Sequence, residues 1–343
     1  MTKKIKHTDL SLTPDVRHAI DLAYDRVLNA STFILGAEVE AFEAEWAEYN
    51  NTRYCIAVGN GFDGLQLCLR TQGAAEDRSV IVPAFTAPPV WSAVLSLNSI
   101  PVVYEEGAYA FASISVNLYG ERAPLFDTDF KIEDASQSHG LPPNKDADAT
   151  VHSFYPTKNL GALGDGGSIL TNSEPLAVFL RSLHNYGTNG AVNSRLDTLQ
   201  AAFLRAKLPY LNTWNARRYE NACAYDSLLR DTPLHLPDIN AESVWHQYAV
   251  LCTDNADRDA LRAYLADDGI ETLIHYPVPP HLLFNTHKLA AGYHALPQSL
   301  HDAEDRAQRT LSLPIGPHIT KKDIETITES TLHYYENLHS LRR

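Results

Sequence analysis

Between residues 53 and 170 the chain alternates short apolar segments with segments of helical spacing, and this alternation constrains the fold more than any other feature. Apolar residues also recur at helical spacing just before it, at Val39, Phe42, Trp46 and Tyr49. We predict helices at 62–70, 89–97 and 175–184, and strands at 53–58, 79–82, 100–104, 113–118, 130–132, 150–154 and 168–170. Such alternation is typical of an α/β fold with a mostly parallel sheet wrapped by helices.

The remainder of the chain has a different organisation. A long helical pattern covers 196–229, and we expect an interruption near Pro209 because proline lacks the amide hydrogen that an interior turn needs. Thr320 and Asp323 have the spacing of a capping arrangement at the start of a last helix. The other elements predicted here are a strand at 245–252, helices at 256–267 and 300–310, and that last helix from residue 321.

The length of the chain predicts two domains. At 343 residues it exceeds the ~250–300 residues at which single hydrophobic cores stop growing. We place the boundary inside the long helical pattern, so that residues 1–215 form an N-terminal segment and a large α/β domain, and residues 216–343 form a small C-terminal α/β domain. Ligands of open sheets bind at the carboxyl ends of the strands, so candidate functional residues are those that follow predicted strands.

Charge, hydropathy and cysteine content exclude several classes of protein. The formal net charge is −14 with acids and bases interspersed, whereas a nucleic-acid surface needs a basic stripe. No run of ~18 apolar residues could span a bilayer, and the first residues lack the apolar centre of a signal peptide. The four cysteines have no CxxC spacing and lie among apolar residues, as buried reduced thiols do. These features predict a cytoplasmic enzyme with no nucleic-acid or membrane partner.

A glycine-rich stretch, Gly59-Asn60-Gly61-Phe62-Asp63-Gly64, lies between a predicted strand and a predicted helix. It matches the G-x-G-x-x-G pattern, in which a tight turn brings the amides of a helix N-terminus close to a phosphate. A nicotinamide dinucleotide would also require an acid about 20 residues further on, and residues 82–85 contain none. Binding of another phosphate group and a purely structural turn both stay open.

Two further segments carry residues suited to chemistry. The predicted strand at 130–132 runs into Asp134, which could face a site or cap the next helix. Lys158 lies between a predicted strand and a glycine-rich turn at 161–167, where it is either functional or a solvated surface cation. A phosphate-binding turn, an acid at a strand end and a lysine in a close-packed glycine loop are together the parts of a pyridoxal-phosphate site.

Other kinds of active site find less support. The 15 histidines show neither the H-E-x-x-H pattern nor paired ligand spacing beside acids, which disfavours a metal site. The G-x-S-x-G pattern of a serine nucleophile is also missing. No G-x-x-x-x-G-K spacing is present, so Lys158 is not the lysine of a phosphate-binding P-loop.

From about residue 33 to residue 317 the sequence resembles the DegT/DnrJ/EryC1/StrS sugar aminotransferases, which are fold-type I pyridoxal-phosphate enzymes. The block Ser153–Gly167 resembles the cofactor-lysine signature of this family almost letter for letter. Further similar segments are 132–137, 193–202, His275-Tyr276-Pro277 and Leu313-Pro314. The resemblance implies a large cofactor domain with a mostly parallel sheet, followed by a smaller C-terminal α/β domain.

The resemblance also implies roles at the ring of pyridoxal 5'-phosphate. Lys158 would form the Schiff base with the cofactor, and Asp134 would pair with the pyridine nitrogen. Gln137 would contact the ring hydroxyl. An amine is required for the Schiff base, and a carboxylate keeps the ring nitrogen protonated so that the ring can accept electrons.

The phosphate of the cofactor would be held by residues of two chains. Gly61, Phe62 and Ser153 would bind it from one chain, and Asn193 would reach it from the partner chain. The amino end of the helix that begins near Gly61 would supply fixed dipoles for the phosphate. The resemblance therefore implies a homodimer.

We expect a pyridoxal-phosphate-dependent aminotransferase that acts on a nucleotide-linked keto-6-deoxyhexose, with glutamate as amino donor. Gly59-Asn60-Gly61 followed by Asp63 is similar to members that act at sugar carbon 3 of dTDP-linked substrates, in the biosynthesis of deoxyamino sugars for surface polysaccharides. One alternative is a sugar dehydratase of the same fold, which typically has histidine in place of Lys158. Another is a non-catalytic ligand-binding or regulatory relative, against which the joint presence of Lys158, Asp134 and Gln137 argues.

Three features depart from the pattern of many family members. Asn60-Gly61-Phe62 replaces Ser-Gly-Thr at the phosphate turn, which removes one hydroxyl donor. Ala87 stands where many members have an aromatic residue that stacks on the cofactor ring. The stretch between residues 105 and 127 is shorter than usual.

Overall fold

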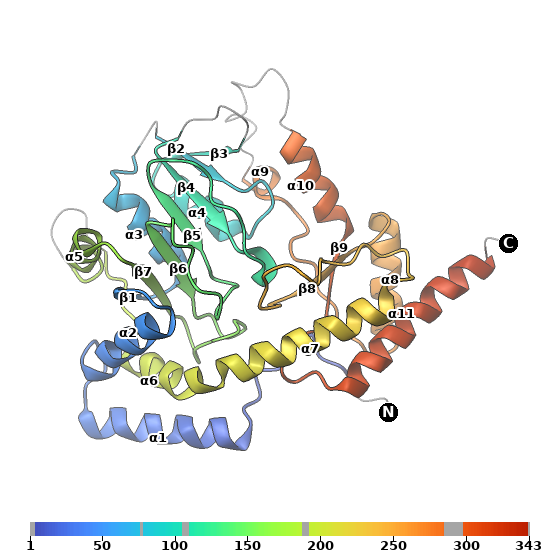
Figure 1. Cartoon of the computed structure of the whole chain (residues 1–343), viewed down its shortest axis with the longest axis horizontal. Helices are drawn as coiled ribbons and strands as arrows, with labels where there is room; N and C mark the ends of the chain where they lie inside the picture. Colours follow the sequence, from blue (N-terminus) through green and yellow to red (C-terminus); the bar gives the residue numbers. More distant parts are fainter. Residues whose placement is uncertain (1–3, 76–77, 105–109, 187–191, 285–297, 342–343) are drawn as a thin grey trace.

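The computed structural model describes residues 4–75, 78–104, 110–186, 192–284 and 298–341 (Figure 1). Its centre is a seven-stranded sheet in the order β1-β7-β6-β5-β4-β2-β3. Neighbouring strands pair in parallel, except that β7 is antiparallel to both β1 and β6. The strands are β1 (Tyr54–Val58), β2 (Ser79–Val82), β3 (Ile100–Val103), β4 (Ala112–Val116), β5 (Lys131–Asp134), β6 (Ala149–Ser153) and β7 (Gly167–Thr171). The predicted α/β fold with a mostly parallel sheet is confirmed.

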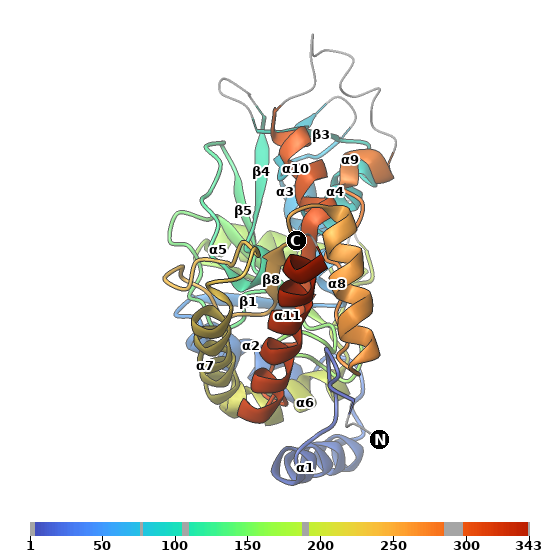
Figure 2. The ribbon, with the colours of Figure 1, turned by 90° about the vertical axis from the view of Figure 1, so that its right-hand side faces the viewer.

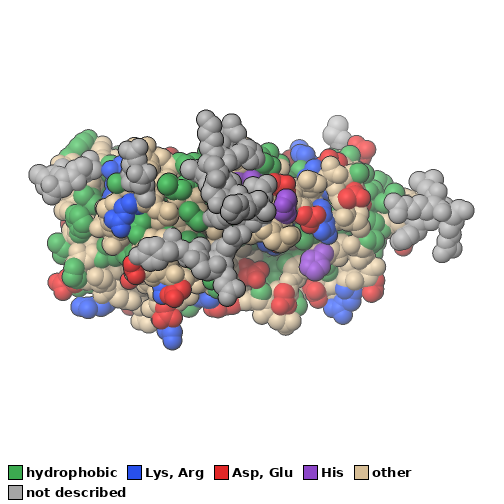
Figure 3. All heavy atoms as spheres, turned by 90° about the horizontal axis from the view of Figure 1, so that it is seen from above, with side chains coloured by type: hydrophobic (Ala, Val, Ile, Leu, Met, Phe, Trp, Pro, Cys, Tyr) green, Lys and Arg blue, Asp and Glu red, His purple; other side chains and the backbone are tan. Residues whose placement is uncertain are grey.

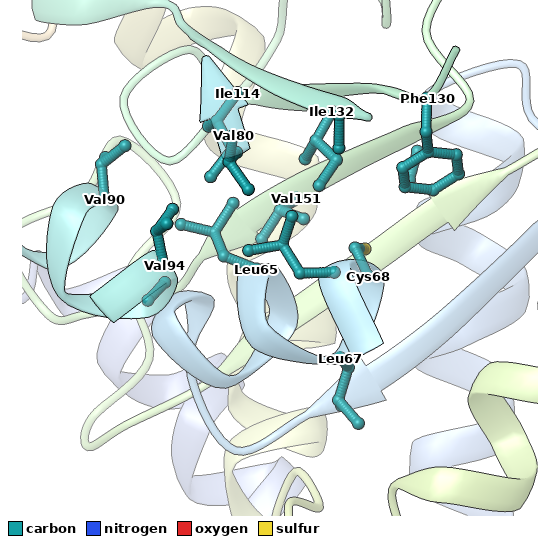
Figure 4. Close-up of a cluster of buried hydrophobic side chains, with 14 of the residues drawn as sticks. Leu65, Leu67, Cys68, Val80, Val90, Val94, Ile114, Phe130, Ile132 and Val151 are labelled. Carbon is teal, nitrogen blue, oxygen red and sulfur yellow. The ribbon is translucent and has the colours of Figure 1, made fainter. Parts of the chain in front are cut away.

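Helices cover both faces of this sheet, because its strands are apolar on both sides. In β1, Ile56 packs into the core formed with α3, α4 and α5, whereas Cys55 packs on the opposite side with α2 and α6. Figure 4 shows part of the first core, whose side chains include Leu65 of α3, Val94 of α4 and Ile132 of β5. The bounds are α2 (Ala37–Tyr49), α3 (Gly61–Thr71), α4 (Pro88–Leu95), α5 (Glu174–Leu183) and α6 (Thr198–Lys207).

A second hydrophobic core lies in the C-terminal part of the chain. Tyr225 of α7, Tyr248 of β8 and Ile327 of α11 belong to it, and β8 pairs antiparallel with β9. Figure 2 shows α11 between α7 and α8. The elements are α7 (Leu211–Leu229), β8 (Tyr248–Leu251), α8 (Asn255–Asp267), α9 (Pro280–Leu283), α10 (Gln298–Arg309), β9 (Thr310–Leu313) and α11 (Lys321–Leu341). The predicted boundary near residue 215 falls in the first turns of α7, and the division into two domains stays a prediction.

The N-terminal segment connects these two parts. Ile5 forms a parallel bridge with Ile270 and belongs to the C-terminal core. Residues 14–30 form α1 (Pro14–Ala30), which packs against Phe203 of α6. We did not predict α1 from the sequence, although Pro14 stands at its first turn and its buried residues recur at helical spacing, at Val16, Ile20, Ala23 and Val27.

Most predicted elements are confirmed to within a few residues. The break near Pro209 is the 3-10 turn η2 (Leu208–Tyr210), which separates α6 from α7. The predicted cap of α11 is present: the Asp323 amide donates to Thr320 Oγ1 at 3.1 Å, and the Thr320 amide donates to Asp323 Oδ2 at 3.0 Å. A second 3-10 turn, η1 (Leu118–Gly120), follows β4.

Two elements of the C-terminal part differ from the prediction at one end. The strand expected at 245–252 begins only at Tyr248, because the backbone of Trp245 is left-handed with φ 53°. The helix expected to run to Thr310 ends at Arg309, and Thr310 starts β9, a strand that we did not predict. Residues 105–109, within the stretch that is shorter than in many family members, lie outside the described residues.

The described surface carries charges of both signs, and the cysteines are free thiols. On the face shown in Figure 3, acidic and basic side chains are interspersed. Of the helices within the described ranges, none has both the length and the apolar character to cross a bilayer. Cys55, Cys68 and Cys252 are buried free thiols, whereas Cys223 is half-buried.

Candidate functional site

Three strand ends and one helix start meet at the same edge of the sheet. β5 ends at Asp134 and β6 ends at Ser153, and α3 begins at Gly61 just after β1. Since β1 and β6 are both antiparallel to β7, they point in the same direction. The structure therefore brings Gly61, Asp134 and Ser153 to the carboxyl edge of the sheet, where ligands of open α/β sheets bind.

Gly61 packs directly onto the end of β6. A Cβ atom at Gly61 would lie 2.8 Å from Ser153 Cβ and 3.2 Å from Ser136 Oγ, so a side chain there would force these neighbours to move. Asn60 caps α3, because its side chain accepts a hydrogen bond of 2.8 Å from the amide of Asp63. The remaining amides of the first turn and the two serine hydroxyls form a cradle of donors at the positive end of a helix, which suits a phosphate.

Ser136 was not among the predicted site residues. Its amide donates to Asp134 Oδ1 at 3.0 Å, and its hydroxyl lies beside Gly61. The only signal for it in the sequence was its place within the segment 132–137. Phe62, which was predicted, packs its half-buried ring against the core formed with α3, α4 and α5. Its backbone amide, in the first turn of α3, is therefore the group that could bind a phosphate.

Asp134 and Lys158 interact electrostatically inside the protein. Burial raises the pKa of Asp134 above its ordinary value, while the Ser136 hydrogen bonds and the charge of Lys158 act in the opposite direction. Burial lowers the pKa of Lys158 from 10.5 to about 8, and the Asp134 carboxylate partly opposes this shift. Lys158 is therefore a desolvated amine that loses its proton far more readily than a surface lysine, as a Schiff-base lysine must.

Gln137 is buried and has both ends of its amide engaged. Its Oε1 accepts a hydrogen bond of 2.7 Å from the amide of Tyr119, and its Nε2 donates to the hydroxyl of Tyr276 at 3.0 Å. Burial raises the pKa of Tyr276 to about 12, so this hydroxyl stays protonated. Tyr276 was expected only as part of the His275-Tyr276-Pro277 marker, and its contact with Gln137 places it beside a predicted ring-binding residue.

A compact loop between β6 and β7 carries Lys158. The Ala162 amide donates to the carbonyl of Phe154 at 2.7 Å and closes the base of the loop, while the amide of Lys158 donates to Tyr155 at 2.9 Å. Asn159 donates to Asn215 Oδ1 at 2.9 Å and so attaches the loop to α7. The loop thus holds the backbone of Lys158 in one place relative to the ends of β5 and β6.

Asn193 is exposed in the single chain and lies outside this group of residues. Its side chain donates to the hydroxyl of Tyr186 at 2.7 Å. The neighbouring Ser194 connects the segment to the start of α3, because its hydroxyl donates to Asp63 Oδ2 at 2.6 Å and accepts from the amide of Gly59 at 2.9 Å. A role for Asn193 in the site of a partner chain stays a prediction.

A cavity of about 350 Å³ lies beside Lys158. Its wall includes Lys207 at the end of α6, Arg218 of α7 and the N-terminal segment from His7 to Thr13. Burial lowers the pKa of His7 to about 3, so its imidazole is neutral, and burial lowers the pKa of Arg218 to about 10, so its guanidinium stays charged at neutral pH. Lys158 lines this cavity, whereas Gly61, Asp134, Gln137 and Ser153 do not, so the cavity adjoins the predicted cofactor-binding residues only through Lys158.

The residues that the structure describes include no cluster of three or more His, Cys, Asp or Glu side chains that could hold a metal ion. The described site consists of an acid, a desolvated amine, an amide and a helix N-terminus with two serine hydroxyls. Each matches one part of pyridoxal 5'-phosphate: the pyridine nitrogen, the aldehyde, the ring hydroxyl and the phosphate. The residues therefore fit this cofactor.

Known proteins of similar sequence match 90–98% of the chain. The sensory transduction protein EryC1 of erythromycin biosynthesis from Saccharopolyspora erythraea is 38% identical, covering 90% of this chain and 93% of its own. The dTDP-3-amino-3,4,6-trideoxy-alpha-D-glucose transaminase of Streptomyces venezuelae is 36% identical, covering 98% of both chains. The described chain therefore corresponds to nearly all of each of these relatives.

Solved structures of similar proteins have the same fold as this chain. DesV of Streptomyces venezuelae, crystallised with a ketimine intermediate, superimposes with a TM-score of 0.88 at 35% identity, covering 98% of this chain and 99% of that one. NtdA of Bacillus subtilis with bound cofactor PMP gives a TM-score of 0.88 at 26% identity over 98% of this chain and 86% of that one. These likenesses confirm the fold-type I aminotransferase architecture. The sequence profile of one family matches residues 14–110 and 130–331, and the chain belongs to it: the DegT/DnrJ/EryC1/StrS aminotransferase family.

Proposed function

We propose that this sugar aminotransferase transfers the amino group of glutamate to carbon 3 of a dTDP-linked keto-6-deoxyhexose, for the biosynthesis of deoxyamino sugars of a surface polysaccharide. The observation that carries the chemistry is the desolvated Lys158, with its pKa lowered to about 8, beside the Asp134 carboxylate. The names of two similar transaminases, 36% identical over 92–98% of this chain, specify dTDP-linked 3-amino sugars. Relatives named for UDP-linked sugars are 32–33% identical.

The enzyme depends on pyridoxal 5'-phosphate, as its family does. When bound, this cofactor supplies an electron-accepting ring that stores the amino group between the two substrates. We propose that the α3 N-terminus at Gly61 and Phe62, with the hydroxyls of Ser153 and Ser136, binds the phosphate. Gln137 would then donate its remaining amide hydrogen to the ring hydroxyl, since its other groups bond Tyr119 and Tyr276.

Lys158 holds and moves protons in this proposal. Because its pKa of about 8 lies near neutral pH, a usable fraction of its amine is unprotonated and can act as nucleophile. The same amine, once free, can take a proton from one carbon of the reacting group and return it to another, since a base works best with a pKa near the working pH. Asp134 would pair with the pyridine nitrogen and would hold its proton there.

We further propose a cytoplasmic homodimer in which Asn193 reaches the phosphate site of the partner subunit. Two observations support this: Asn193 is exposed, and Ser194 anchors its segment beside α3 through Asp63. Large apolar side chains are also exposed on and after α1 and near the site, namely Leu22, Tyr24, Leu28, Phe33, Ile34, Tyr155, Leu163 and Tyr186. A partner surface would remove them from water. The division at residue 215 into a cofactor domain and a small domain is part of the same proposal.

The purified protein tests the proposal directly. Reduction with borohydride should fix the cofactor mass on the peptide that contains Lys158, and the variant Lys158→Ala should show no such peptide. Incubation with glutamate should then discharge the yellow colour, and a dTDP-3-keto-6-deoxyhexose should restore it with release of a 3-amino sugar. Attachment at Lys207 or another lysine would contradict the site assignment. Cofactor bound at Lys158 without transfer to any keto-sugar in a panel of dTDP- and UDP-linked compounds would contradict the proposed reaction.

A further inference from the structure

Lys207 is a buried lysine with an unusual set of partners. It is the last residue of α6 and only 8% exposed. Its ammonium donates a hydrogen bond to the carbonyl of Gly161 and lies 5.9 Å from the ring centre of Trp214. Among the residues that the structure describes, no carboxylate forms an ion pair with it, and burial alone lowers its pKa to about 8.

The burial of this ammonium lowers the stability of the folded chain. Burying a cation without a carboxylate costs free energy, and a carbonyl together with an aromatic face compensates only in part. A methionine or leucine would fill the same apolar space without this cost. The feature of the structure that requires a donor at this place is the carbonyl of Gly161.

Gly161 belongs to the tight turn that carries Lys158. A Cβ atom at Gly161 would lie 2.4 Å from the carbonyl oxygen of Pro156, so the chain returns onto itself between these two residues and leaves no room for a side chain. Lys158 stands inside this turn. Any movement of the Gly161 carbonyl therefore shifts the backbone of the turn, and with it the side chain of Lys158.

Lys207 is one of several contacts that fasten this loop to α6 and α7, which run along the bottom of the sheet in Figure 1. Gln200 of α6 accepts from the Leu163 amide at 2.9 Å, and Asn215 of α7 accepts from Asn159 at 2.9 Å. Lys207 supplies the charged contact, and a hydrogen bond from a charged donor is stronger than one between neutral groups. Lys207 and Lys158 also line the same cavity of about 350 Å³.

We propose that Lys207 is a positioning residue for Lys158: it holds the Gly161 carbonyl so that the turn keeps the Lys158 amine desolvated and directed toward the strand ends. The inference rests on the proposed role of Lys158 as the cofactor lysine. Without the ammonium the turn relaxes, the half-buried Lys158 side chain becomes more exposed to water, and its pKa moves back toward 10.5. Less neutral amine is then available at neutral pH, and the reaction slows.

Three variants and one control test this inference. Lys207→Met removes the donor and keeps the apolar stem, Lys207→Gln keeps a neutral donor, and Lys207→Arg keeps a charged one. Lys145→Met alters an exposed lysine in the connection between β5 and β6 and serves as the matched control. In the full-length chain freed of cofactor, acetic anhydride labelling of Lys158 is followed against pH by mass spectrometry. In the holoenzyme, kcat and KM are measured with glutamate and the keto-sugar.

Lys207→Met should raise the labelling pKa of Lys158 by about one unit and lower kcat about tenfold, with the KM of the keto-sugar within about threefold of wild type. Lys207→Arg should recover most of both losses, Lys207→Gln should fall between, and Lys145→Met should match wild type. An unchanged labelling pKa in Lys207→Met would overturn the inference. So would failure of both Lys207→Met and Lys207→Gln to fold while Lys207→Arg folds, since the role would then be stability alone.

The labelling result separates this inference from the proposed function. If borohydride does not fix the cofactor on Lys158 of the wild type, the proposed function fails, whereas the labelling pKa of Lys158 still reports whether Lys207 controls that amine. If the cofactor is fixed on Lys158 and Lys207→Met leaves both the labelling pKa and kcat unchanged, the proposed function stands and only the role of Lys207 is wrong.

Discussion

The side chain of Gln137 donates a hydrogen bond of 3.0 Å from Nε2 to the hydroxyl of Tyr276. This bond joins the loop after β5 to the segment that precedes α9. Tyr119 completes this connection, because its amide donates to Gln137 Oε1 and its hydroxyl donates to the carbonyl of His275. The residues at the strand ends are thus bonded to a segment more than a hundred residues away in sequence. The orientation of Gln137 depends on these two tyrosines.

Replacing Tyr276 tests this dependence. Tyr276→Phe removes the acceptor of the Gln137 amide, so Gln137 is free to turn away from the ring-binding position. We expect kcat/KM to fall about threefold to tenfold and the free energy of unfolding to fall by about 0.5–1.5 kcal/mol, the net contribution of one hydrogen bond. Steady-state kinetics and urea denaturation measure both quantities. Tyr219→Phe, at an exposed tyrosine of α7, is the control. Equal kinetics in the two variants would show that Gln137 needs no orientation by Tyr276.

The burial of Lys158 should make the cofactor-free protein less stable at neutral pH. Because its folded pKa of about 8 lies below the ordinary 10.5, the unfolded chain binds more protons between these values, and stability rises with pH across this window. Below pH 8 the folded state carries the cost of a partly desolvated cation, since Lys158 is half-buried. We expect Lys158→Met to be more stable than wild type at pH 7 by on the order of 1–3 kcal/mol, and the difference to shrink toward pH 10.5. Urea denaturation at several pH values measures it; a pH-independent difference would contradict the assigned burial.

Asp134→Asn should leave the cofactor bound and nearly abolish turnover. An amide cannot keep the pyridine nitrogen protonated, so the ring accepts electrons poorly, and we expect kcat to fall by roughly 10²–10⁴-fold. Absorbance of the bound cofactor and single-turnover kinetics with glutamate measure binding and rate separately. A variant within about tenfold of wild type, or ~1.4 kcal/mol, would mean that Asp134 serves only its hydrogen bond with the Ser136 amide.

Mixed dimers test whether Asn193 serves the partner subunit. Chains with Lys158→Ala are mixed with chains carrying Asn193→Ala under conditions in which subunits exchange. In a two-fold dimer that shares residues between chains, one site of each mixed dimer collects both substitutions and the other collects none. Random mixing makes about half of the dimers mixed, so roughly a quarter of wild-type activity should return.

Two controls make the mixing experiment decisive. The Asn193→Ala homodimer must itself be clearly impaired, and native mass spectrometry must show that subunits have exchanged. If exchange is complete and activity stays at the level of the parent variants, Asn193 and Lys158 serve the site of the same chain.

Local patterns in the sequence were sufficient to predict most of the sheet. The strands are short apolar segments bounded by polar turns, and all seven were predicted to within a few residues. The direction of β7 could not be predicted, because it depends on pairing with β1 and β6, which is a long-range property. α1 was missed although Pro14 and the spacing of Val16 and Ile20 indicated it; its burial requires α6, nearly 200 residues further along the chain.

The candidate site likewise contains residues that the sequence indicated and residues that only the structure revealed. Asp134 and Lys158 follow predicted strands, which made them candidates, and the family resemblance implied their joint role at the cofactor ring. Ser136, Tyr276 and Lys207 act through contacts that no local pattern shows: a close approach to Gly61, a bond to Gln137 and a bond to Gly161. These contacts arise from packing between distant elements, and only a three-dimensional structure reveals them.

The antiparallel pairing of β6 with β7 limits how far the cofactor lysine can travel. Ser153 is in register with Gly167, and the Phe154 amide donates to Gly166 at 2.7 Å, so both ends of the loop that carries Lys158 are bonded to each other. A helix crossover would let its two ends separate when neighbouring elements shift, whereas a hairpin does not. The two ends of the loop therefore cannot separate without breaking these hydrogen bonds, so the amine of Lys158 stays within one loop length of the ends of β6 and β7.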